Sequence, residues 1–190
     1  MKLLYPAFRR GEFLAILGFT TLGGLIGGSY GIVHDLVTFS ICREYFVRLK
    51  FNQFSWANIG LPEQLFAAEI GAIATGAVGA IAGWFLGRTA VPACSPALAK
   101  HVILQGFVLI IAAASIAGAL GNYSGVLHDH NYGNWDDVCD ALGVVDVPDF
   151  VRVAYIHNGS YIIGGLLGLL LAISIVRLAT RAEARSCFRQ

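Results

Sequence analysis

The chain has 190 residues, of which 56% are hydrophobic and only 13% are charged, with 23 glycines and a formal net charge of +1. An average soluble domain has roughly 25% charged residues, so this composition disfavours a soluble enzyme and a disordered chain. The near-neutral charge offers no basic surface for nucleic acid. An apolar, glycine-rich chain of this length is instead typical of one domain of closely packed membrane helices in a lipid bilayer.

Four apolar runs are long enough to cross a bilayer, which takes about 20 residues. They cover residues 12–33, 62–86, 102–127 and 150–176. We therefore predict an all-α fold, an integral membrane four-helix bundle that forms a single domain over residues 1–190. The segments 34–61 and 123–149 are then the two outer loops.

The basic residues indicate an orientation. The N-terminus, the second loop and the C-terminal tail carry nine Lys and Arg residues, whereas the other side carries four, three of them in the first outer loop and Arg152 just inside the fourth run. Because positive charge is retained in the cytoplasm, we expect both termini to be cytoplasmic and the chain to lie in a bacterial inner membrane. The first run is too long for the apolar core of a cleaved signal peptide, so we interpret it as a permanent helix.

The two halves of the chain resemble each other. The first run ends in Tyr30-Gly31-Ile32-Val33-His34-Asp35, and the third ends in Tyr123-Ser124-Gly125-Val126-Leu127-His128-Asp129. The glycines of the second and fourth runs also align, and this alignment sets Glu69 opposite His157. The pattern indicates two similar helix hairpins related by duplication about an axis along the membrane normal.

Each run brings a histidine or a carboxylate to the outer half of the bundle. Ionisable groups at this depth are costly and mark functional sites. Small residues precede or follow each of them at helical spacing, so we expect all of them to face the bundle axis. The residues are His34, Asp35, Glu69, His128, Asp129 and His157.

Imidazole and carboxylate groups that converge in this way can bind iron, copper, zinc or manganese. We predict His34, Glu69, His128 and His157 as ligands, with Asp35 and Asp129 completing the set or orienting the imidazoles. Asn158, Ser160 and Tyr161 would either donate hydrogen bonds to the ligands or join neighbouring helices by hydrogen bonds. The Glu-x-x-His pattern of di-iron bundles is absent. Two alternatives stay open: polar helix ends that bind no metal, and haem held by two of the histidines.

Two features of the outer loops bear on this site. Residues 43–51 mix aromatic side chains with cations, which indicates an amphipathic segment at the membrane surface or a lid over the polar cluster. Cys42 and Cys139 fall in the two outer loops at comparable places of the repeat, so we expect a disulfide between them. Two free, buried thiols are the alternative.

Three stretches carry a family resemblance: residues 30–35, Glu44-Tyr45-Phe46 and His157-Asn158-Gly159-Ser160-Tyr161. They resemble those of a family of small bacterial four-span membrane proteins of uncharacterised function. The resemblance covers most of the chain and implies the four-span topology. It implies no catalytic activity for any residue of the chain.

The leading functional hypothesis is a membrane-embedded metal-binding protein, with an oxidoreductase as the enzymatic form of it. The alternative is a non-catalytic accessory subunit of a larger membrane complex, respiratory or photosynthetic, whose partners are other membrane subunits or further copies of the chain. A small transporter is third, because the middle of the four runs offers few polar groups for a translocation path.

Overall fold

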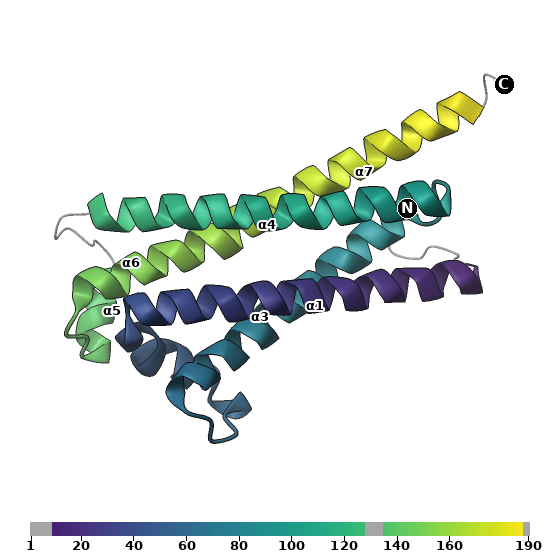
Figure 1. Ribbon diagram of the computed structural model, residues 1–190. Helices are drawn as coiled ribbons and strands as arrows, with labels where there is room; N and C mark the ends of the chain where they lie inside the picture. Colours follow the sequence, from purple (N-terminus) through teal and green to yellow (C-terminus); the bar gives the residue numbers. More distant parts are fainter. Residues whose placement is uncertain (1–8, 128–134, 188–190) are drawn as a thin grey trace.

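The computed structural model describes residues 9–127 and 135–187. The described residues contain helices and no strand, and four long helical rods lie side by side (Figure 1). The first three rods are α1 (Arg10–Ile41), α3 (Glu63–Ala90) and α4 (Pro96–Leu127). The fourth is continuous through α6 (Val147–His157), the π-helix η3 (Asn158–Gly165) and α7 (Leu166–Cys187). The short elements are η1 (Tyr45–Lys50), α2 (Phe51–Gln53), η2 (Ser55–Ala57) and α5 (Trp135–Leu142).

The predicted all-α fold with four long apolar helices is confirmed. All four rods are long and apolar enough to cross a membrane. The first helix continues beyond the predicted end at Val33 and reaches Ile41. It does so because Asp35, Thr38 and Cys42 are buried at helical spacing, so the inward face of α1 extends two further turns. His34 and Asp35 therefore lie within a helix rather than at its end.

Backbone contact at glycines holds α1 against α3. A Cβ atom added to Gly31 would overlap the side chain of Thr75 and the backbone carbonyl of Gly71. A Cβ atom on Gly23 would overlap the carbonyl of Gly79 in the same way. Only glycine lets the two helices approach so closely, which is how membrane helices associate without a hydrophobic driving force between them.

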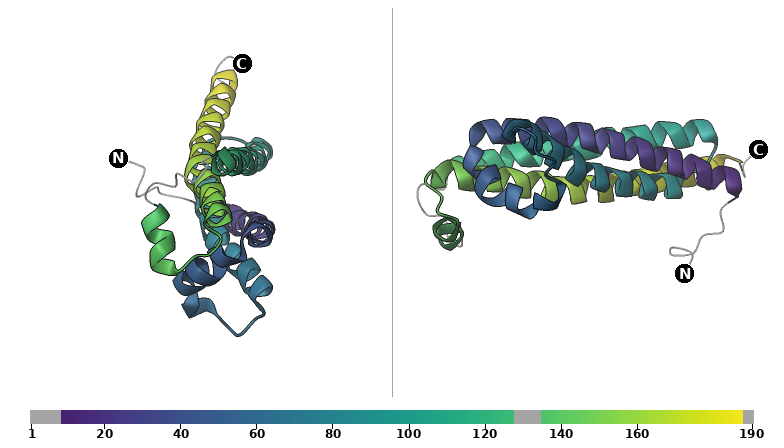
Figure 2. Two further views of the ribbon diagram at one scale, coloured as in Figure 1. Left: turned by 90° about the vertical axis from the view of Figure 1, so that its left-hand side faces the viewer. Right: turned by 90° about the horizontal axis from the view of Figure 1, so that it is seen from below.

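The second hairpin, formed by α4 and the fourth rod, is also held together by backbone contact at glycines. A Cβ atom on Gly121 would overlap the carbonyl of Tyr155, and one on Gly159 would overlap the carbonyl of Ala117. The α4 helix thus packs against the rod formed by α6, η3 and α7. Figure 2 shows the two hairpins from one end and from below. Both hairpins predicted from the sequence are present as helix pairs.

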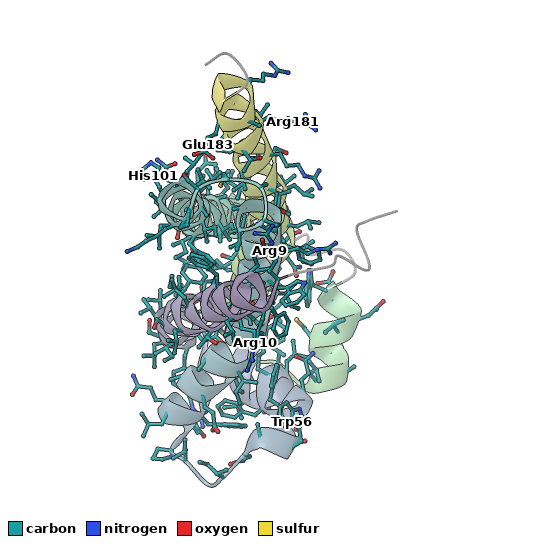
Figure 3. All side chains as sticks on the ribbon, turned by 90° about the vertical axis from the view of Figure 1, so that its right-hand side faces the viewer. Arg9, Arg10, Trp56, His101, Arg181 and Glu183 are labelled. Atoms are coloured by element: carbon teal, nitrogen blue, oxygen red, sulfur yellow. The ribbon has the colours of Figure 1, made fainter. Side chains whose placement is uncertain are left out.

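The two ends of the bundle differ in character. Figure 3 looks from the end at which α1 begins and α7 finishes, where Arg9, Arg10, His101 and Arg181 are labelled. At the opposite end, Tyr45, Phe46 and Phe150 join residues of α3, α5 and α6 in an apolar cluster. The segment that follows α1 and the helix α5 therefore gather at one end, and the connection from α3 to α4 closes the other.

The predicted disulfide is absent: Cys42 and Cys139 are both free and buried. Each thiol packs within the apolar cluster at the loop end of the bundle. Burial raises the pKa of both thiols, which keeps them in the protonated, unreactive form. The expectation of a bridge fails because these side chains serve as small apolar groups of a shared core.

Candidate metal centre

Three potential metal ligands meet where α1 lies against the junction of α6 and η3. His34 and Asp35 come from α1, and His157 is the last residue of α6. One ligand atom from each lies within 4.8 Å of the other two. Asp35 and His157 are buried, with exposed fractions of 1% and 3%. The rings of His34 and His157 meet edge to face with centroids 4.7 Å apart.

A π-helix follows directly after His157. This wider helical turn is rare and is frequent at functional sites when it interrupts an α-helix. The segment contains three glycines, and it carries Ser160 and Tyr161, both of which contact α1. The Tyr161 ring also lies edge-on to His157, with centroids 5.2 Å apart. The π-helix thus directs two adjacent side chains at the same cluster.

Hydrogen bonds fix His34 and one oxygen of Asp35. The Tyr161 hydroxyl donates to Asp35 Oδ1 over 2.8 Å and lies 2.9 Å from His34 Nδ1. His34 Nδ1 is itself 3.1 Å from Asp35 Oδ1. The other nitrogen, His34 Nε2, is 3.1 Å from the hydroxyl of Ser160. This network links α1 to η3 across the middle of the cluster.

The environment of His157 indicates its tautomer. The Thr38 hydroxyl donates to the backbone carbonyl of His34 over 2.9 Å, which leaves its oxygen free to accept. His157 Nε2 lies 3.2 Å from that oxygen, so the ring proton is assigned to Nε2. His157 Nδ1 then presents a bare lone pair. It is buried without a hydrogen-bond partner among the described residues.

Asp35 carries the second unpartnered atom of the cluster. Its Oδ2 oxygen is buried and accepts no hydrogen bond within residues 9–127 and 135–187. A buried carboxylate oxygen without a donor is costly, because it has lost its water and gained nothing in exchange. The cluster therefore contains two buried, unpartnered lone pairs on chemically suitable metal ligands.

The segment after α1 covers the cluster. Tyr45 stacks on His157 with ring centroids 5.0 Å apart, and Phe46 lies edge-on to the same ring at 6.0 Å. Lys50 Nζ lies 5.7 Å from the centre of the Tyr161 ring. Burial lowers the pKa of Lys50, and the negative charge of Asp35 opposes that effect. Of the two sequence interpretations of residues 43–51, these contacts favour the lid.

A groove lies along one side of the cluster. It has a volume of about 410 Å³ and runs between α1, α4 and α6, and His34, Thr38 and Ser160 are among the residues that line it. Asn122 and Arg152 lie in the same groove and are joined by a 2.7 Å hydrogen bond. Only 8% of the His34 side chain is exposed, so a small part of its ring faces this groove.

Several predicted residues stand apart from this group. Glu69 does not belong to the set of potential ligands that the described residues bring together, although its Oε2 atom is buried without a hydrogen-bond partner. Asn158 is exposed. His128 and Asp129 lie outside the described residues.

Thr38 belongs to the site although it was not among the predicted residues. A signal for it was present, because Thr38 follows His34 by four residues and so shares its helical face. The individual roles of Tyr45 and Lys50 had no such signal, since they depend on how the chain turns back after α1.

Comparisons with known proteins identify no relative with this arrangement of residues. No protein family matches the chain, and neither a curated protein nor a solved structure matches it.

Proposed function

We propose that the chain is an integral membrane protein that binds one divalent transition metal ion through His34, Asp35 and His157. Its four long apolar helices support the membrane location, as do the apolar side chains on their outer surface, such as Leu25 and Val108. The basic end shown in Figure 3 then faces the cytoplasm and the metal site lies toward the outer face.

The observation that carries the proposal is the pair of unpartnered atoms, Asp35 Oδ2 and His157 Nδ1, in a buried group of three ligands. A cation is the simplest partner for a carboxylate oxygen that no donor reaches. Two imidazoles and one carboxylate suit zinc, iron, manganese and copper. The Tyr161 hydroxyl orients Asp35 and the Nδ1 side of His34, as outer partners of metal ligands commonly do. His34 then binds the ion through Nε2, with the ion taking the place that Ser160 holds at that nitrogen.

Three protein ligands leave at least one coordination position for water or a reactant. This is the arrangement of catalytic metal sites, whereas structural zinc sites are closed by four protein ligands. A redox-active ion such as iron would make the protein an oxidoreductase, because a site with two histidines, one carboxylate and open positions is that of non-haem iron oxygenases.

The geometry disfavours haem held between His34 and His157. The rings of His34 and His157 are in edge-to-face contact, so no porphyrin fits between them as a doubly ligated group. The interior space next to Tyr161 is about 140 Å³, which is too small for a macrocycle.

Elemental analysis of the purified protein tests the proposal. We expect one transition metal ion per chain in the wild type and at least a tenfold lower content in Asp35→Asn and His157→Ala. His101→Ala is the matched control, since His101 is an exposed histidine at the opposite end of the bundle and should retain the full content (Figure 3). A metal-free wild type, or an equal loss in all three variants, contradicts the proposal and leaves a hydrogen-bonded network that joins helices.

A further inference from the structure

A second, separate space lies on the inner side of Tyr161. It is a cavity of about 140 Å³ between the two hairpins. Its walls come from α1, α3, α4, η3 and α7, and they include Gly27, Thr75, Ala82, Ile110, Ser160 and Tyr161. Ser160 also lines the groove described above, so this side chain and the cluster behind it separate the two spaces.

The cavity offers little to water. Of its hydroxyl groups, that of Thr75 donates to the backbone carbonyl of Gly27 over 2.8 Å. The Tyr161 hydroxyl is occupied by Asp35, and Ser160 Oγ is held by His34. Tyr30 brings one further hydroxyl to the wall. A bound water needs two to four polar partners, and with the other three hydroxyls engaged the cavity offers too few, so it stays dry.

The cavity reaches the outer apolar surface of the bundle. Val78 and Ile111 lie on its wall, and Val78 is 60% exposed. The cavity therefore opens beside α3, on the surface that faces the acyl chains if the helices span a bilayer. A molecule dissolved in the bilayer can enter there without crossing the polar loop end.

We propose that this cavity binds a small apolar molecule from the bilayer and holds it beside Tyr161, as the reactant or ligand of the metal site. This inference rests on the proposed function and names the chemical class of its substrate. A dry apolar cavity of about 150 Å³ binds benzene or xenon, which sets the upper size at about one six-membered ring. Dioxygen and short hydrocarbons are within that limit, whereas lipids are not.

Xenon is the probe. In crystals of the wild-type protein under xenon pressure, we expect anomalous scattering at one site between Ala82, Ile110 and Tyr161. Ala82→Leu adds three carbon atoms to the wall and should lower xenon occupancy at least fivefold. Ala77→Leu makes the same change on the exposed face of α3, away from the cavity, and should leave occupancy unchanged.

Val78→Phe is a second variant that spares the core, because it enlarges a side chain at the rim and should also lower occupancy. Ordered water in the wild-type cavity, no xenon there, or full occupancy in both cavity variants overturns the proposal. Metal content is measured on the same preparations. Xenon in the cavity of a metal-free wild type would refute the metal site and the role as its reactant, while bound metal without xenon would refute the cavity assignment alone.

Discussion

Replacing Gly31 with alanine tests how the α1–α3 contact supports the cluster. A Cβ atom there would overlap Thr75 Oγ1 and the carbonyl oxygen of Gly71, and would lie 2.6 Å from that carbonyl carbon. Backbone atoms cannot rotate away, so the helices must separate. Overpacking costs typically 1–3 kcal/mol, and we expect the upper end of about 3 kcal/mol. The better helix propensity of alanine returns about 1 kcal/mol, which leaves a net loss of about 2 kcal/mol.

Gly18→Ala is the matched control in the same helix, because nothing lies within 4 Å of its added Cβ atom. This change should stabilise the protein by up to about 1 kcal/mol through helix propensity alone. Unfolding of both variants and the wild type in detergent, with dodecyl sulfate as denaturant and circular dichroism as readout, measures the difference. Equal free energies of unfolding for the two variants would refute the close α1–α3 contact.

Three further outcomes are expected. Tyr161→Phe removes a hydrogen bond to the aspartate of the cluster and should lower the free energy of unfolding by about 1.5–3 kcal/mol in metal-free protein, by the same detergent assay. Lys50→Met removes a cation that faces the site and should tighten metal binding in a competition titration with a chelator. Lys100→Met, at the far end of the bundle, should leave the affinity unchanged. Equal metal affinities for the two variants would contradict the assignment of residues 43–51 as a lid. Maleimide should label Cys42 and Cys139 in denatured protein without reductant, and labelling that requires reductant would restore the disulfide.

The sequence predicted the helices and part of the site for a clear reason. Four apolar runs separated by polar segments leave little choice of fold, and the small residues beside His34 and His157 correctly indicated that these two side chains face each other across the bundle. Such arguments need only helical spacing, which is the same in every regular α-helix.

Glu69 shows where that reasoning ends. Its place in the ligand set came from its depth in the second run and the small residues at helical spacing after it, and the alignment with His157 added to this. However, α3 is a regular α-helix throughout, while the fourth rod contains the π-helix η3 immediately after His157. A π-turn changes the number of residues per turn, so equal spacing no longer means equal direction. Lys50 and Tyr45 reach the site through the fold of a loop, which periodicity does not describe.

The most direct test of the metal site is X-ray absorption spectroscopy at the zinc edge of protein loaded with Zn²⁺. The account predicts a first shell with two imidazole nitrogens at about 2.0–2.1 Å and one carboxylate oxygen at about 2.0–2.2 Å, and the loss of one imidazole in His157→Ala. A shell of oxygen atoms alone, an unchanged spectrum in that variant, or a protein that takes up no zinc would contradict it.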